Sequence, residues 1–319
     1  RRVLFRSLVH SLIFLLRKYK VIIMLLGIDV GGTKIEGIVL KSRENPEEII
    51  RHRVDTEEYR GYDQVIKNIS YLVLHIEEKV GYTFKKLGIG TPGTIDPETG
   101  FLKNSNSQCL NGKPIQKDLA KVLDKKVLIQ NDANCFALAE TLLGSVRDKY
   151  PNAKNVFGVI IGTGVGGGII IDGKTVYGRQ GIGGEWGHTI VTDSGDECYC
   201  GKSGCVESVI SGKALQVYYN KISGKNLKFE DIYSLRERDS HAKKTLKRLI
   251  KHFGKGLSNV VNIFDPDVIV LGGGLSNVNE LYTDGYKELK KYVFNPTFKT
   301  PILRPKLGDS AGVFGAALL

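Results

Sequence analysis

The chain has 319 residues, of which 41% are hydrophobic and 25% charged, values typical of a globular protein with one large or two medium domains. Its net charge is +12, but six of the 46 basic residues lie in the first 23, leaving 40 against 34 acidic ones. A mild excess spread along the chain argues against a nucleic-acid partner.

The first 23 residues differ from the rest. They contain no acidic residue, and their apolar run SLVHSLIFLL is too short to span a bilayer. Two interpretations stay open, an artefact upstream of Met24 and a targeting peptide, and we favour the artefact. No other stretch approaches transmembrane length. Five cysteines without a secretory signal favour reduced thiols, so we expect a cytoplasmic protein with no membrane partner.

From Met24 the chain alternates apolar strands and helices. It opens as strand, glycine turn, strand (MLLGIDV-GGT-KIEGIVL), and a helix is predicted over 61–80 with apolar residues at 65, 69, 72, 73 and 76. A strand at 87–93, a polar loop at 94–113, a helix near 114–124 and a strand at 127–130 follow. The next helix begins at NDANCFALAE.

The opening pattern returns at residue 156 as VFGVII-GTGVGG-GIIIDGK. One element occurring twice, about 130 residues apart, predicts two related half-domains. The region 213–264 is predicted to be helical, and a buried strand then runs into the glycine turn of DVIVLGGGLSN at 267–277. AGVFGAALL is predicted to form a C-terminal helix. The alternation of strands and helices predicts an α/β protein.

The glycine-rich turns do not match two common nucleotide motifs. GTGVGG at 162–167 has the spacing of a dinucleotide-binding turn, but a strand follows it where that motif needs a helix. GKS at 201–203 lacks the upstream glycine of a P-loop. Both chemistries are therefore excluded.

The same turns suit another kind of phosphate site. Backbone N–H groups of a glycine turn can cradle an anion, and Asp29 at a strand end could hold Mg²⁺. The alternative is that these are ordinary hairpin turns, but three such turns in one chain favour nucleotide binding. The candidate residues are Asp29, Gly31, Gly32, Thr33 and Lys34, then Gly162, Thr163 and Gly164, and finally Gly272, Gly273 and Gly274.

Four potential metal ligands lie within HTIVTDSGDECYCGKSGCVE at 188–207. His188, Cys198, Cys200 and Cys205 form a Cys₃His set, which is typical of closed tetrahedral structural zinc sites. The C-x-C spacing is not that of a thioredoxin-like redox pair, and a reducing compartment disfavours a disulfide. Four protein ligands leave no position for a catalytic water.

Asn131-Asp132 lies at the junction of a predicted strand and a predicted helix. The carboxylate of Asp132 is a candidate proton acceptor. A carboxylate held at a fixed position beside a ligand can act as a general base. The carboxylate of Asp132 is equally expected there as a helix N-cap. The residues alone leave both interpretations open.

Together these motifs resemble the ROK family (repressors, open reading frames, kinases) over residues 24–319. The hairpins are similar to the two phosphate elements of the actin-like ATPase fold, and the GGG turn to its adenosine element. The family's E-x-G-H and C-x-C-G-x-x-G-C-x-E motifs are matched by EWGH at 185–188 and CYCGKSGCVE at 198–207. The resemblance implies an actin-like (ribonuclease H-like) α/β fold with a cleft between two domains, 24–130 plus 306–319 and 131–305, the larger carrying the zinc loop.

The resemblance also implies roles for residues. Asp132 of NDAN would be the general base. The sugar would be bound by Asn106, Asn131, Glu185, His188 and Glu207. His188 would then use one ring nitrogen for a structural zinc and the other for a sugar hydroxyl. The zinc would steady the sugar-binding loop.

The function that the resemblance implies is ATP- and Mg²⁺-dependent phosphorylation of the 6-hydroxyl of a hexose by a homodimeric enzyme. KNSNSQCLNGKP and the other motif stretches look most like bacterial manno(fructo)kinases, so we expect fructose or mannose, with N-acetylglucosamine or glucose as alternatives. A transcriptional repressor is another class, but the 28 residues ahead of Asp29 are too few for its winged helix. A non-catalytic sugar-binding module is disfavoured by the intact Asp29 and Asp132.

Overall fold

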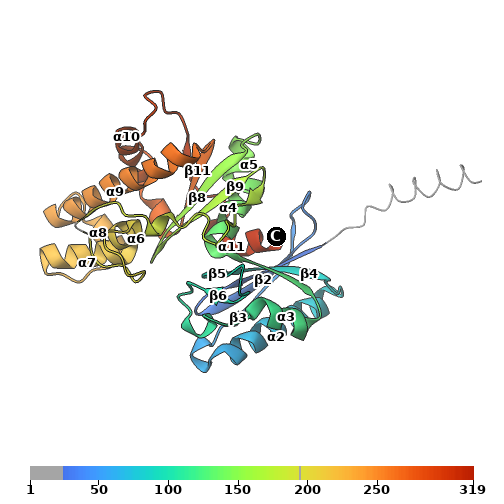
Figure 1. Cartoon of the computed structure of the whole chain (residues 1–319). Coiled ribbons are helices and arrows are strands. Elements are labelled where there is room, and N and C mark those ends of the chain that lie inside the picture. Colours follow the sequence, from blue (N-terminus) through green and yellow to red (C-terminus); the bar gives the residue numbers. More distant parts are fainter. Residues whose placement is uncertain (1–23, 194) are drawn as a thin grey trace, which may run out of the picture.

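The structure is a computed structural model that describes residues 24–193 and 195–319 (Figure 1). The segment 1–23, on which the artefact and targeting interpretations fall, lies outside the described residues. Two five-stranded sheets face each other across a central pair of helices, with further helices on their outer sides (Figure 1). Among the described residues, none of the helices combines the length and hydropathy that a bilayer span requires.

The first sheet has the strand order β3-β2-β1-β4-β7. The chain forms an antiparallel meander of β1, β2 and β3, and then adds β4 and β7 parallel to β1. The predicted glycine turn joins the first two strands. The strands are β1 (Leu25–Val30), β2 (Lys34–Leu40), β3 (Glu48–Asp55), β4 (Lys86–Thr91) and β7 (Lys126–Asn131).

The second sheet repeats this design with the order β10-β9-β8-β11-β12. Its first three strands are again an antiparallel meander, and its last two are again parallel to the first strand. The prediction of two related half-domains is therefore confirmed at the level of topology. The strands are β8 (Asn155–Ile161), β9 (Val165–Ile171), β10 (Lys174–Thr175), β11 (Val268–Gly272) and β12 (Ile302–Leu303).

Helices α2 (Tyr62–Val80) and α3 (Ile115–Leu123) cover the outer face of the first sheet (Figure 1). The predicted apolar face of α2 is confirmed, because each of its five side chains is fully buried: Val65, Ile69, Leu72, Val73 and Ile76. These side chains join the strand residues in one hydrophobic core. This core fixes β1 and β2, the two strands that the first glycine turn joins.

Helices α4 (Asp132–Leu142) and α11 (Ala311–Ala317) pack against each other between the two sheets (Figure 1). Small residues permit this close approach, since a Cβ added to Gly158 of β8 or Gly315 of α11 would collide with α4. Because α4 is clamped from both sides, its N-terminal residue Asp132 has a defined position. The division of the chain into domains at residue 130, with 306–319 returning to the first, stays a prediction.

The outer side of the second sheet carries most of the remaining helices. The predicted helical region 213–264 is interrupted twice, because Gly224 in the left-handed region ends α7 and the Asp239 side chain caps the start of α9. The helices are α5 (Ser145–Lys149), α6 (Val206–Ile210), α7 (Gly212–Ser223), α8 (Phe229–Ser234), α9 (Ser240–Phe264) and α10 (Asp284–Lys290).

The polar segment 94–113, predicted to be a loop, contains a short hairpin of β5 (Thr94–Ile95) and β6 (Leu102–Lys103). Strands of two residues carry too little periodicity to be recognised in a sequence. The hairpin is followed by residues 104–111, whose backbone is held by Asn111: its side chain accepts a hydrogen bond from the N–H of Ser105 (2.9 Å) and donates to the carbonyl of Ser105 (2.8 Å).

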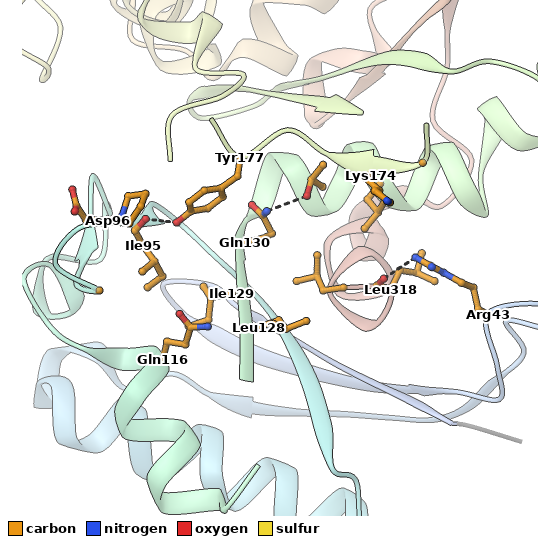
Figure 2. A pocket seen from close by; sticks show the side chains of 16 residues that line it. Arg43, Ile95, Asp96, Gln116, Leu128, Ile129, Gln130, Lys174, Tyr177 and Leu318 are labelled. Carbon is orange, nitrogen blue, oxygen red and sulfur yellow. Dashed lines mark hydrogen bonds between the residues drawn. The ribbon is translucent and has the colours of Figure 1, made fainter. Parts of the chain in front are cut away.

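The edge strands β7 and β10 of the two sheets meet around a cavity of about 580 Å³ (Figure 2). Gln130 of β7 donates a hydrogen bond to Thr175 of β10 (3.0 Å), and the Tyr177 hydroxyl donates to the carbonyl of Ile95. These contacts join the two halves of the molecule next to Asn131 and Asp132. None of the predicted site residues lines this cavity.

Candidate active site and metal cluster

A cavity of about 200 Å³ lies between the two sheets and gathers nine of the predicted site residues. They come from segments far apart in the chain: the loop after β6, the start of α4, the β8–β9 turn, and the segments around the cysteine motif. The nine are Asn106, Asn131, Asp132, Gly162, Thr163, Gly164, Glu185, His188 and Glu207. Their chemistry combines carboxylates, amides and an imidazole with a bare glycine turn, which suits a polyhydroxylated ligand beside an anion.

Asp132 is the first residue of α4 and is open to this cavity. The N-cap is Asn131, whose side-chain oxygen accepts a hydrogen bond from the N–H of Ala133 (2.9 Å). Asn131 also donates to the carbonyl of Gly93 (3.4 Å). The N-cap alternative that we considered for Asp132 is therefore wrong: Asn131 is the cap and Asp132 is the first helical residue, although one oxygen of Asp132 also accepts from Ala133 (2.8 Å).

The carboxyl groups of Asp29 and Asp132 both have raised pKa values. Burial raises the pKa of Asp29 to about 7, helped by the negative charges of Asp132 and Glu36. The pKa of Asp132 is also raised, because the protein around it excludes water, although hydrogen bonds from the α4 backbone oppose the shift. Two neighbouring carboxylates with raised pKa values form an environment that favours a divalent cation or a bound proton.

Two glycines, which have no Cβ, leave space around the Asp29 carboxylate. A Cβ at Gly90 would lie 3.1 Å from one oxygen, and a Cβ at Gly312 would lie 3.3 Å from the other. Asp29 does not line the cavity of about 200 Å³, and neither do residues 31–34 or the GGG turn at 272–274. Of the residues predicted to bind a nucleotide, only those of the 162–164 turn line that cavity.

The two outlying turns have structural features of their own. In the first turn the N–H of Gly31 donates to the carbonyl of Lys34 (2.9 Å), closing a tight hairpin. In the GGG turn Gly273 has φ +75°, and its Cβ would meet β8, while a Cβ on Gly272 would meet the ring of Phe136. Gly274 faces open space. Two of these glycines therefore have packing reasons that a sequence motif does not reveal.

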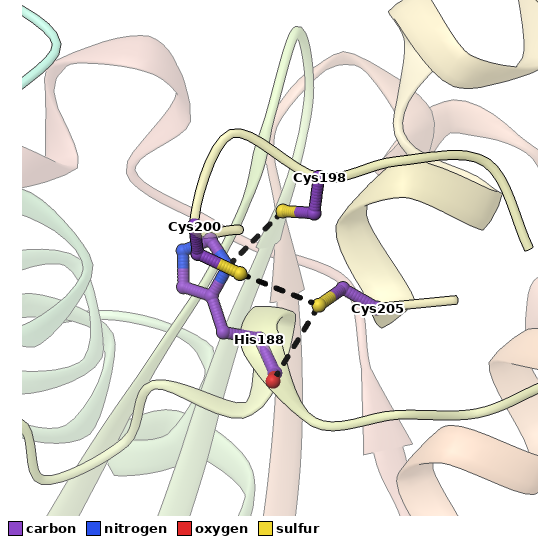
Figure 3. A group of neighbouring side chains, drawn as sticks. All are labelled: His188, Cys198, Cys200 and Cys205. Atoms are coloured by element: carbon purple, nitrogen blue, oxygen red, sulfur yellow. Dashed lines mark hydrogen bonds between the residues drawn. The ribbon is translucent and has the colours of Figure 1, made fainter. Parts of the chain in front are cut away.

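The predicted metal ligands converge (Figure 3). The ligand atoms of His188, Cys198, Cys200 and Cys205 all lie within 4.8 Å of one another. Nδ1 of His188 is 3.5 Å from Sγ of Cys198, and the sulfurs of Cys200 and Cys205 are 3.6 Å apart. Donors bound to one tetrahedral zinc ion are separated by about 3.5 to 3.8 Å, given bond lengths of about 2.0 to 2.3 Å. The thiols are free, so no disulfide competes.

The electrostatics of the cluster also fit a cation. Burial and the neighbouring thiols raise the pKa of Cys205 to about 12, so this sulfur needs a nearby positive charge to become a thiolate. Bridges between Ile190 and Cys205 and between Glu197 and Ser203 tie the segment into a compact loop. The four side chains could therefore hold a metal ion in a closed site.

His188 directs its two ring nitrogens to different partners. Nδ1 faces the thiols, whereas Nε2 lies 3.0 Å from the hydroxyl of Tyr199, whose ring stands edge-on to the imidazole. Tyr199 also lines the cavity, as does Asn104. No sequence motif predicted a role for either residue. A tyrosine between two ligand cysteines and an asparagine two positions before Asn106 were the available signals.

Glu207 and Trp186 connect the cavity to its supports. One oxygen of Glu207 accepts a hydrogen bond from the N–H of Val165 (2.8 Å), so this residue braces the glycine turn as well as lining the cavity. Trp186 is buried and donates from its indole to the carbonyl of Gly166 (2.9 Å). The side chain of Trp186 packs in the core and does not line the cavity.

Comparison with known proteins places this geometry in a family. The pattern of the ROK family matches residues 25–319. The chain is 37% identical over 309 residues to an N-acetyl-D-glucosamine kinase of Histophilus somni, which covers 93% of this chain and 98% of the relative. It is 36% identical over 307 residues to an N-acetyl-D-glucosamine kinase of Aliivibrio fischeri, with 93% and 99% covered.

Solved structures of ROK proteins superpose on this chain. A ROK hexokinase from Thermus thermophilus superposes with a TM-score of 0.82 at 30% identity, covering 92% of this chain and 97% of that chain. A ROK glucokinase from Streptomyces griseus, solved with glucose and AMPPNP, superposes with a TM-score of 0.73 at 27% identity, covering 92% and 98%. The predicted actin-like α/β fold is thereby confirmed. This chain belongs to the ROK family.

Proposed function

We propose that the protein is an ATP-dependent sugar kinase that phosphorylates the 6-hydroxyl of N-acetylglucosamine. The observation that carries the proposal is the single cavity in which Asp132 faces Glu185, His188 and Glu207 beside a glycine turn. Relatives named as N-acetyl-D-glucosamine kinases support this sugar, our alternative, over the fructose or mannose that we expected first.

In this proposal Asp132 accepts the proton of the 6-hydroxyl as the phosphoryl group arrives. A raised pKa makes its carboxylate a better proton acceptor. Glu185, whose pKa is also raised by burial, would bind sugar hydroxyls together with Glu207 and Asn106. Asn131 fixes the start of α4 and keeps its amide group at the cavity wall.

ATP would be bound by the glycine turns, with its phosphates beside the N–H groups of residues 162–164 and 31–34. Asp29 is suited to hold Mg²⁺, because its carboxylate is flanked by Gly90 and Gly312 and carries a raised pKa. The magnesium ion would neutralise phosphate charge. The GGG turn at 272–274 would lie near the adenosine.

The first test is a coupled ADP-release assay with N-acetylglucosamine, glucose, mannose and fructose at equal concentrations. We expect the highest kcat/KM for N-acetylglucosamine. A preference for mannose or fructose would instead support the sugar that the motif resemblance suggested. If ATP and Mg²⁺ bind normally but none of the four sugars is phosphorylated, the kinase proposal is wrong.

The cluster of His188 and the three cysteines is proposed to hold a structural Zn²⁺, which supplies no chemistry to phosphoryl transfer. Its role is to fix the ring of His188 and the loop 198–205 beside the sugar. Cytoplasmic localisation and a homodimer stay predictions of the sequence.

Loss of the metal is expected to weaken sugar recognition before nucleotide binding. Cys200→Ser should lower the zinc content and raise the sugar KM about tenfold or more, the effect usual for disturbed metal surroundings, while the KM for ATP stays within about twofold. Atomic absorption and steady-state kinetics measure both. Cys109→Ser is the matched control, since Cys109 lies outside the cluster. An unchanged sugar KM in metal-free protein would contradict the coupling.

A further inference from the structure

A second cavity, which we call the annex, opens beside the candidate sugar cavity and has a volume of about 620 Å³. The two cavities share five lining residues but differ in one respect that matters: Asp132 and Asn131 line the first and not the second. The annex therefore begins at the end of the sugar cavity that is remote from the proposed base. The shared residues are Asn104, Asn106, Glu185, His188 and Tyr199.

Polar groups suited to an amide stand at this shared boundary. The side chains of Asn104 and Asn106 are exposed, and neither has a hydrogen-bond partner within the described part of the chain. The backbone between them is held by the two hydrogen bonds of Asn111 with Ser105. Two free amide side chains on a braced loop can donate to a carbonyl oxygen and accept from an N–H group.

Apolar surface lies in the same annex. Tyr199 is 76% exposed and Ile182 is 44% exposed, although both are large hydrophobic side chains. The position of Tyr199 is determined by its hydroxyl, 3.0 Å from Nε2 of His188, and by the ligand cysteines on either side of it. Exposed apolar side chains that line a cavity with a few polar groups are typical of a ligand site.

We propose that the annex receives the acyl group on the 2-amino nitrogen of a hexosamine. The inference rests on the proposed function, which places the 6-hydroxyl at Asp132. In a pyranose ring C2 lies diagonally opposite C5, the carbon that bears C6. A substituent on C2 therefore points away from Asp132, past Glu185 and His188, and into the annex. Its amide meets Asn104 and Asn106, and its alkyl part contacts Ile182 and Tyr199.

The size of the annex extends the substrate class beyond the acetyl group. Ligand pockets of about 300 to 1,000 Å³ hold whole drug-sized molecules, so an annex of about 620 Å³ has room for more than the three heavy atoms of an acetyl group. The protein should consequently accept N-propanoyl- and N-butanoylglucosamine as well as N-acetylglucosamine.

The test compares glucose with the N-acetyl, N-propanoyl and N-butanoyl derivatives of glucosamine, measuring kcat/KM by ADP release and binding by calorimetry. For the unmodified protein we expect all three amides to exceed glucose by about tenfold or more, and the butanoyl derivative to stay within about fivefold of the acetyl one, since only favourable contacts are added. Ile182→Trp should lower kcat/KM progressively with chain length, by about tenfold or more for the butanoyl derivative.

Ile263→Trp is the control for added bulk, because Ile263 lies on α9, is 88% exposed and lines neither cavity. It should leave the order of the four sugars unchanged. Rejection of the butanoyl derivative by the unmodified protein, or an equal loss for all four sugars in Ile182→Trp, would overturn the assignment of the annex. Binding in the expected order without phosphorylation of any sugar would instead contradict the kinase function and leave the annex standing.

Discussion

Asp132→Asn is expected to lower kcat by about 1,000-fold, within the range that a positioned general base contributes. Asparagine keeps the size of the side chain and its contact with the N–H of Ala133, but it cannot take the proton of the sugar hydroxyl. The dissociation constants of sugar and nucleotide should change by less than about threefold, because the other polar residues of the cavity are intact. Single-turnover kinetics and calorimetry measure the two effects separately.

A matched control for this variant is Asp172→Asn. Asp172 is an exposed residue in the turn after β9, in the left-handed region that asparagine adopts as readily as aspartate, and it lines neither cavity. Its kinetics should equal those of the unmodified protein. If Asp132→Asn keeps more than about a tenth of the normal kcat, another group accepts the proton.

Asp29→Asn is expected to make the nucleotide-free protein more stable at alkaline pH. The pKa of Asp29 is about 7 in the folded protein and 3.8 ordinarily, so folding favours the protonated form. The stability that depends on this proton is fully present below about pH 4 and is lost as the pH rises towards 7 and above, because the unfolded chain ionises first. Asparagine cannot ionise and removes this dependence.

The effect can be measured by urea unfolding of both proteins in Mg²⁺-free buffer. The stability advantage of Asp29→Asn should grow by about 2 kcal/mol between pH 5 and pH 8, allowing for partial solvent exposure of the site. The variant should at the same time lose its response to Mg²⁺ and ATP. Parallel pH profiles for the two proteins would show that the folded-state pKa of Asp29 is ordinary.

Local patterns in the sequence were sufficient for much of this architecture. The apolar spacing of 61–80 predicted both the helix α2 and its buried face. The repeated strand–turn–strand pattern predicted two similar sheets, and the spacing of the cysteine motif predicted a four-ligand cluster. These features depend on neighbours a few residues apart, whose relative positions follow from the period of a strand or helix and the reach of a short loop.

Other features arise from contacts between distant segments and had no local signal. The burial of Trp186 depends on a hydrogen bond from its indole to the carbonyl of Gly166, twenty residues away in the chain. Glu207 was expected at the sugar, but its bond to Val165 also joins α6 to the glycine turn. Tyr199 takes the nitrogen of His188 that we had reserved for a sugar hydroxyl.

In the candidate active site, too, some features follow from local sequence and others from contacts between distant segments. Residue types and spacing indicated which side chains carry the chemistry, since carboxylates, thiols and glycine turns are recognisable in any context. The packing of α4 between two sheets decided where Asp132 faces, and the approach of the 104–111 loop to Tyr199 created the annex. A cavity is bounded by surfaces from several segments, so its shape depends on all of their packing contacts at once and cannot be obtained from any one stretch of the chain.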